Sequence, residues 1–189
     1  MEAIDLGLSV KWADRNLGAN SPDEVGTFYA WAETSSKNDY SWETYEDMID
    51  QGKFGPYKES HFKSGLFKID SGHDAMTLKF GHPCRIPTSD DFRELITNCK
   101  WIYTNESQTS GFRIYGMNGN SIYMPAYGMP NYLLKYWSAN RCINPQHAEI
   151  LELHSKRAPE IFYRSRYYGF NIRGVCGLQN YFQSNEQCR

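Results

Sequence analysis

Apolar and polar positions alternate most clearly near the C-terminus, in AEILELHS (residues 148–155). Leu151 and Leu153 occupy every second position, as in a strand with one buried face. The positions around them hold an apolar side chain, a carboxylate and an imidazole: Ile150, Glu152 and His154. The pattern predicts that both leucines are buried and that these three side chains are exposed on the opposite face of the strand.

A helical pattern occurs in PTSDDFRELITNC (residues 87–99). Its apolar side chains recur at the i, i+3, i+4, i+7 spacing of one helix face: Phe92, Leu95, Ile96 and Cys99. Thr88 or Ser89 can cap the N-terminus, and the carboxylates of Asp90 and Asp91 suit the first turn. This segment is therefore predicted to be the main helix.

Shorter patterns predict the remaining elements. GHDAMTLKFG (residues 72–81) predicts a second, shorter helix ended by its last glycine, and SPDEVG (residues 21–26) a single turn. Residues 111–126 predict a β-hairpin, because the Asn-Gly dipeptide between two alternating segments is a strong turn signal. Residues 34–68 are polar, aromatic and irregular, which indicates a long loop. The aromatic side chains expected to hold this loop down are Trp42, Tyr45 and Tyr57.

These patterns predict a single domain over residues 1–189, because the chain is long enough for one good core and too short for two. The predicted class is α+β, with short antiparallel strands, two helices and long loops. We expect the apolar face of the main helix to pack against a sheet that contains Trp12 and Phe170.

Composition narrows the function. Aromatic residues make up 15% of the chain, which suits binding faces because Tyr and Trp combine a buried ring with a solvated polar tip. The net charge of −2 argues against general nucleic-acid binding. No apolar run approaches the about 20 residues of a transmembrane helix. The N-terminus, MEAIDLGLSVKW, shows no signal peptide.

The five cysteines form neither a CxxC pair nor a metal-ligand spacing. They are Cys84, Cys99, Cys142, Cys176 and Cys188. An odd number leaves at least one thiol unpaired in a monomer. Buried or incidental thiols in a reducing compartment are the favoured interpretation, and a single disulfide stays open as an alternative.

Motifs for catalysis and cofactors give little support to an enzyme. Cys142 and His147 could pair as a thiol and a base, but their spacing says nothing about geometry. The other histidines match no zinc motif, and no glycine-rich nucleotide motif occurs. Asp90 and Asp91 are explained by their place at the start of a helix. We therefore predict no catalytic residue, no metal and no cofactor.

Charge gathers in the C-terminal third. Residues 141–173 carry six Arg or Lys and three Glu, a local charge of +3 that leaves −5 for the rest of the chain. Together with the aromatic side chains this indicates a contact surface, since Arg and Tyr are favoured interface anchors. The plainer interpretation is a solvated strand edge.

Several segments between Ile4 and Val175 occur in a recognisable order: DLGLSVKWADRNLGA, FYAWAET, YSWETY, CRIPTSDDFRELITNCKW, GNSIYMPA, YWSAN and RYYGFNIRGV. In this order they resemble the Fibrobacter succinogenes major paralogous domain, common in gut Bacteroidales. RIPTSDDFREL followed by YGFNIR is also similar to formylglycine-generating-enzyme-like domains, a branch of the C-type lectin fold. The resemblance implies a C-type-lectin-like fold, in which a short sheet and two helices support a loop-rich ligand surface.

Proteins of this branch serve as variable proteins of diversity-generating retroelements, which rewrite chosen codons near the C-terminus and leave framework codons fixed. The resemblance implies a variable ligand-binding segment at residues 141–164. Its variable positions are Arg141, Gln146, His147, Ile150, Glu152, His154, Glu160, Phe162 and Arg164. The framework implied to be buried includes Leu151, Leu153, Tyr168 and Phe170, whereas Ile150, Glu152, His154, Glu160, Phe162 and Arg164 are expected to be exposed on one face.

The resemblance thus implies a non-enzymatic receptor-binding or adhesion protein at a cell surface, outside the cell or on a virion. Its partner would be a protein or glycan on another cell or virus. The alternatives are a non-diversified, fimbria-associated module of the same family and an enzyme of the formylglycine-generating type. Calcium-dependent sugar binding is not implied, because the EPN or QPD and WND motifs are missing, and the oxidase cysteine pair has no match.

Overall fold

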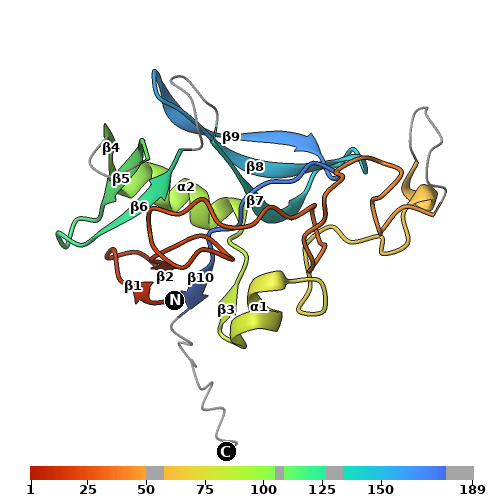
Figure 1. The fold of residues 1–189 in the computed structure, drawn as a ribbon, viewed down its shortest axis with the longest axis horizontal. Coiled ribbons are helices and arrows are strands. Elements are labelled where there is room, and N and C mark those ends of the chain that lie inside the picture. Colours follow the sequence, from red (N-terminus) through yellow and green to blue (C-terminus); the bar gives the residue numbers. More distant parts are fainter. Residues whose placement is uncertain (50–57, 105–108, 127–133, 178–189) are drawn as a thin grey trace, which may run out of the picture.

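A computed structural model describes residues 1–49, 58–104, 109–126 and 134–177 (Figure 1). This part of the chain forms two α-helices and three small antiparallel sheets, so the predicted α+β class is confirmed. The first sheet contains, in order, β1 (Ala3–Ile4), β2 (Val10–Ala13), β10 (Val175–Gly177) and β3 (Cys84–Arg85). The second contains β4 (Lys100–Thr104), β5 (Gly111–Tyr115) and β6 (Ser121–Pro125). The third contains β7 (Leu134–Arg141), β8 (His147–His154) and β9 (Arg157–Ser165).

The main helix, α2 (Ser89–Asn98), begins as its sequence predicts. Thr88 is the N-cap, and its side chain and that of Asp91 form a reciprocal capping box. Phe92 packs against Trp12 of β2, with ring centroids 5.5 Å apart, in the same core cluster as Leu95. The predicted packing of this helix against a sheet that contains Trp12 is confirmed.

The expectation that Phe170 belongs to that sheet is wrong. Phe170 forms an isolated bridge with Tyr29 and packs beside a different core cluster, against Trp137. The reason is that the chain between β9 and β10 passes along residues of the N-terminal loops before it enters the first sheet.

The second helix, α1 (Ala75–Phe80), is capped by Asp74, whose carboxylate accepts hydrogen bonds from the backbone N–H groups of Met76 and Thr77. Gly81 ends the helix at a φ of 73°, a left-handed conformation that favours glycine. The helix and its end at Gly81 agree with the prediction. Residues 21–26 turn as expected, with the Glu24 N–H donating to the Ser21 carbonyl.

The predicted hairpin is the β5–β6 pair, in which Tyr115 lies opposite Ser121 and Gly119 has a φ of 86° in the connecting turn. The loop expected over residues 34–68 has one short 3-10 helix, Glu59–His61, among its described residues. Tyr45 is fully buried in a small cluster, and Trp42 packs against it. Tyr57 lies outside the described residues.

The first sheet brings distant cysteines together. Antiparallel pairing of β3 with β10 places Cys84 opposite Cys176, and the two form a disulfide. The favoured interpretation, that the thiols are unpaired, is therefore wrong for Cys84 and Cys176. The sequence could not show this pairing, because the two residues are 92 positions apart and become neighbours only through strand pairing. Cys99 and Cys142 are free thiols, and Cys188 lies outside the described residues.

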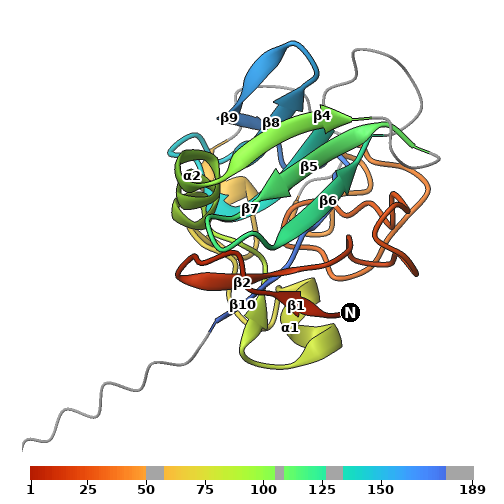
Figure 2. The same ribbon diagram turned by 90° about the vertical axis from the view of Figure 1, so that its left-hand side faces the viewer.

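The third sheet separates two hydrophobic clusters. On one face, Tyr136, Leu151 and Leu153 join the core cluster that also holds the apolar side chains of α2. On the other face, Trp137 and Ile150 join a second cluster built mainly with residues of the N-terminal half. The central strand β8 is consequently buried on both sides over much of its length. The end of the hairpin that joins β8 to β9 projects at the top of the molecule (Figures 1 and 2).

Candidate ligand-binding face

Strand register decides which side chains of the C-terminal segment share a face. Antiparallel pairing places Glu152 opposite Glu160, Ile150 opposite Phe162, and Ala148 opposite Arg164. Because these pairs are two residues apart, all six side chains lie on the same face of the sheet. The prediction that the even-numbered positions of this hairpin share a face agrees with the register.

The same rows continue onto β7. Lys135 lies opposite Glu152, and Trp137 opposite Ile150. We call the surface formed here the Phe162 face. Its members are Lys135, Glu152, Glu160, Phe162, Arg164, Tyr168 and Phe170.

Phe162 and Arg164 are the centre of this face. Phe162 is 40% exposed, and the Arg164 guanidinium lies over its ring, with Cζ 4.6 Å from the ring centroid. Arg164 Nη2 donates to Glu152 Oε2 at 2.7 Å, which fixes the guanidinium in that position. The Glu152 side chain is only 7% exposed, so this ion pair is more shielded from solvent than an ordinary surface pair.

Lys135 completes the charged centre from the side of β7. Burial lowers the pKa of its ammonium group, and the neighbouring Glu152 carboxylate opposes this shift. Its Nζ lies 5.6 Å from the Phe170 ring centroid, a cation–π arrangement. Lys135, Glu152 and Arg164 thus form a row of alternating charge. The Phe162 ring lies at the Arg164 end of this row, and the Phe170 ring lies at the Lys135 end.

The two aromatic side chains at the Lys135 end of the row, Tyr168 and Phe170, were expected to be buried. Tyr168 is 40% exposed, so the expectation of a buried framework position is wrong for it, and Phe170 is only partly buried. The two rings stack with centroids 5.8 Å apart, and Phe170 packs on Trp137 at 4.8 Å. Tyr168 is left exposed because the chain turns immediately after β9, where its N–H donates to the Ser165 carbonyl.

Three expected contact residues are buried instead. Ile150 is fully buried, contrary to the prediction, because the second hydrophobic cluster covers its part of β8. Arg141 is 6% exposed, with its Cζ 3.9 Å from the Phe67 ring centroid. Glu152 is also largely buried, at 6% exposure, although its carboxylate takes part in the charged row of the Phe162 face. Exposure of the whole alternating set was therefore the wrong expectation.

The remaining predicted residues divide between other positions. His147 is on the opposite face of β8, where its ring contacts Tyr163 with centroids 5.3 Å apart. Gln146 lies in the turn before β8, and its carbonyl accepts from the Arg166 N–H. His154 is partly exposed at the end of β8, with Nδ1 accepting from the Lys156 N–H. The structure thus groups Glu152, Glu160, Phe162 and Arg164. Ile150 lies beside them but is buried, and the other predicted residues lie elsewhere.

Sequence reasoning missed Lys135, Tyr168 and Phe170. Lys135 could have been found from the sequence, because strand alternation places its side chain on the face opposite the buried Tyr136. No local pattern distinguishes the exposed ring of Tyr168 from its neighbours, because its surroundings come from distant parts of the chain.

Thiol chemistry is not favoured at Cys142. Burial and the nearby Glu149 carboxylate raise the pKa of this thiol to about 11, the opposite of what a thiolate nucleophile needs. The Cys142 N–H donates to the His147 carbonyl, a backbone contact within a turn. Burial also lowers the pKa of the His147 imidazole.

The part of the chain that the structure describes contains neither a metal-holding cluster nor a membrane-spanning helix. In this part of the chain, no three His, Cys, Asp or Glu side chains come together in a way that could hold a metal ion. Likewise, none of its helices is long and apolar enough to span a membrane.

Comparison of the chain with protein-family models, with curated proteins and with solved structures found no match. The fold and the site together define an α+β domain with an exposed aromatic and charged face on its third sheet.

Proposed function

We propose that the protein is a non-enzymatic binding protein and that the Phe162 face contacts its ligand. The observation that carries this proposal is the exposed Phe162 ring, held beneath an Arg164 guanidinium that is itself fixed by Glu152. Aromatic and Arg side chains are the usual anchors of binding surfaces. Anchors whose positions are fixed before binding lose less conformational entropy when a ligand arrives.

The supporting strand is well suited to this role. Leu151 and Leu153 fix β8 in one core cluster, and Ile150 fixes it in the other. Side chains on the neighbouring edge strand β9 can therefore change with little effect on the core. Separation of a rigid framework from a changeable surface is what a binding protein with many ligands requires.

The sequence resemblance supports a more specific form of the proposal. A C-type-lectin-like fold with a diversified C-terminal segment would place its variable codons at exposed strand positions. Glu160 and Phe162 meet this condition on β9, and Arg164 beside them is partly exposed. Ile150 and Arg141 are core residues and leave the proposed variable set. The ligand would be a protein or glycan on the surface of another cell or a virus.

Binding can be tested with labelled protein on glycan arrays and on panels of intact gut bacteria. The double variant Phe162→Ser/Arg164→Ser should lose the binding that the wild type shows. Leu78→Ser is the matched control, because Leu78 is a 59% exposed apolar residue on α1, outside the Phe162 face. Binding that survives in the double variant but not in the control would place the contact surface elsewhere.

Diversification is tested by the DNA around the gene. A near-identical template repeat that differs at adenines, beside a reverse transcriptase, would support a retroelement variable protein. A gene without such a repeat would favour a non-diversified surface or fimbria-associated module, and the same binding variants would then report on a fixed ligand.

A further inference from the structure

Strand β9 is an edge strand of the third sheet, so one of its sides has no neighbouring strand in the described part of the chain. Figure 1 shows β9 along the top of the molecule, on the outer side of β8. Its pairing with β8 is regular from Glu160 to Ser165. A regular edge of this kind is a template on which a further strand can pair.

The register shows which backbone groups of β9 face outward. It continues to Arg166 and Gln146, where the Arg166 N–H donates to the Gln146 carbonyl at 2.9 Å. Hydrogen-bonded and non-hydrogen-bonded pairs alternate in an antiparallel ladder, so Ile161, Tyr163 and Ser165 direct their N–H and C=O groups away from β8. In the part of the chain that the structure describes, the N–H groups of these three residues have no acceptor.

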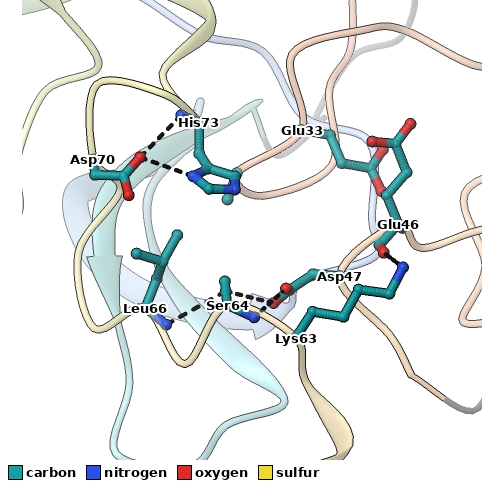
Figure 3. A pocket seen from close by; sticks show the side chains of 9 residues that line it. Glu33, Glu46, Asp47, Lys63, Ser64, Leu66, Asp70 and His73 are labelled. Carbon is teal, nitrogen blue, oxygen red and sulfur yellow. Dashed lines mark hydrogen bonds and ion pairs between the residues drawn. The ribbon is translucent and has the colours of Figure 1, made fainter.

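The C-terminal end of β9 is held firmly. Arg166, directly after the strand, is fully buried, and its Nη2 donates to Asp47 Oδ2 at 2.6 Å. Asp47 also accepts from the backbone N–H and the hydroxyl group of Ser64 (Figure 3). An edge that is fixed in advance loses less conformational entropy when a partner strand binds.

Charge on β9 is self-complementary about Phe162. If two copies pair antiparallel with Phe162 opposite Phe162, each Glu160 lies opposite the Arg164 of the other copy. Glu160 is exposed, lies opposite the like charge of Glu152 and has no ion-pair partner among the described residues. Arg164 can supply that partner, because Glu152 and the Tyr163 carbonyl use only part of its five N–H donors.

The backbone fits the same register. Pro159 would lie opposite Ser165 of the other copy, and it has no N–H to donate. The Ser165 carbonyl needs no such donor, because it already accepts a hydrogen bond from within its own chain. Ile161 would lie opposite Tyr163 of the other copy, and each N–H of this pair would meet a carbonyl. The Tyr163 carbonyl can accept this bond beside that from Arg164, since a carbonyl has two lone pairs.

Exposed aromatic rings adjoin the free edge. Phe162 is 40% exposed and Tyr163 52% exposed, and their rings stack with centroids 4.8 Å apart. Pairing about Phe162 would bring the Phe162 side chains of the two copies together, and aromatic cross-strand pairs stabilise a sheet.

We propose that the free edge of β9 pairs antiparallel with β9 of a second copy of this chain, with Phe162 opposite Phe162. The resulting dimer contains one continuous sheet and presents two Phe162 faces side by side. This pairing depends on the backbone edge and on Glu160 with Arg164, so it does not rest on the proposed ligand binding.

Sedimentation velocity of the wild-type chain, from about 5 µM to about 1 mM, tests the pairing, with an expected dimer Kd of about 100 µM or tighter. Tyr163→Pro should weaken dimerisation about tenfold or more, because it removes an outward N–H that makes no bond in the monomer. Tyr163→Ala is the matched control, since it removes the ring and keeps the N–H, and its Kd should stay within about threefold of the wild type. Melting temperatures of the variants check that each is folded.

Exchange of charge tests the register. Glu160→Arg and Arg164→Glu each place like charges opposite one another in a homodimer and should each weaken dimerisation about tenfold. An equimolar mixture of the two variants restores opposite charges in both cross-strand pairs and should form a heterodimer within about threefold of the wild-type affinity. If Arg164→Glu unfolds the chain, Glu160→Arg and Tyr163→Pro still decide the result.

Three outcomes overturn the proposal. A wild type that stays monomeric at about 1 mM would leave an extended peptide of another protein as the partner of this edge. A dimer that Tyr163→Pro and Glu160→Arg leave unchanged would place the contact on another surface. Folded charge variants that fail to pair when mixed would exclude the register centred on Phe162.

Discussion

Ile150 and Phe162 lie directly opposite each other on β8 and β9, yet Ile150 is fully buried and Phe162 is 40% exposed. Both side chains point to the same face of the sheet. The difference arises because the second hydrophobic cluster covers the central strand and ends before the edge strand. One cross-strand pair therefore joins a core side chain to an exposed one.

Substitutions in this pair should have opposite effects. Ile150→Ala should lower the free energy of unfolding by about 2–4 kcal/mol, because it opens a cavity in a packed cluster. Phe162→Ser should lower it by less than about 1 kcal/mol, since the ring is partly solvated, and should alter ligand binding. Urea denaturation of both variants measures the difference. Equal losses of stability would make Phe162 part of the core and remove it from the binding face.

The Cys84–Cys176 disulfide should contribute strongly to stability. It links positions 92 residues apart, and constraining a loop of that size in the unfolded chain is worth about 4–5 kcal/mol in the chain-entropy estimate. Dithiothreitol should therefore lower the melting temperature of the wild type. The variant with both cysteines replaced by Ala should melt like the reduced wild type and ignore the reductant. A wild type indifferent to dithiothreitol would mean that the bond adds nothing.

Local signals predicted the fold elements well. The capping box at Thr88 and the Asn-Gly turn of the β5–β6 hairpin depend on residues within a few positions of each other, which a sequence displays directly. The β8 strand was also found from its alternation, and its leucines are buried as expected.

Contacts between segments far apart in the chain could not be predicted from such local signals. Alternation shows that Ile150 and Leu151 point to opposite faces, but not that α2 packs on one face and residues of the N-terminal loops on the other. The same limit hid the Cys84–Cys176 pairing and the exposure of Tyr168. The hairpin of β8 and β9 could therefore be recognised from the sequence, whereas the exposure or burial of its individual side chains depends on packing between distant segments.

The capping carboxylate of α2 should make stability depend on pH. Burial of Asp91 disfavours its charge, but hydrogen bonds from Arg85 and Thr88 outweigh this and lower its pKa. The pKa of the Asp91 carboxyl is thus lower in the folded protein than in the unfolded chain, where it is about 3.9. The ionised carboxylate therefore stabilises the fold at pH values above about 3.9, and this stabilisation is lost as the pH falls through the pKa of the folded state.

Asp91→Asn should therefore destabilise the protein by about 1–2 kcal/mol at pH 7, where the wild-type carboxylate is ionised. The gap between wild type and variant should begin to close as the pH falls below the unfolded value of about 3.9, and should vanish below the lowered folded value. Melting temperatures across this range measure the effect. Asp90→Asn is the control, because the Asp90 side chain is 89% exposed and should show little pH-dependent difference. A gap of constant size down to the lowest pH would rule out the charge of Asp91 as its source.

The free thiols should react slowly in the folded protein. Burial raises the pKa of the Cys99 thiol, and burial with the Glu149 carboxylate raises that of Cys142 to about 11. Only the thiolate reacts with iodoacetamide, so at pH 8 the Cys142 peptide should label about 100-fold more slowly than an ordinary thiol of pKa about 8.5. Mass spectrometry of that peptide measures the rate, and urea-unfolded protein provides the reference. Fast labelling of folded Cys142 at neutral pH would reveal an activated thiol and reopen an enzymatic role for this turn.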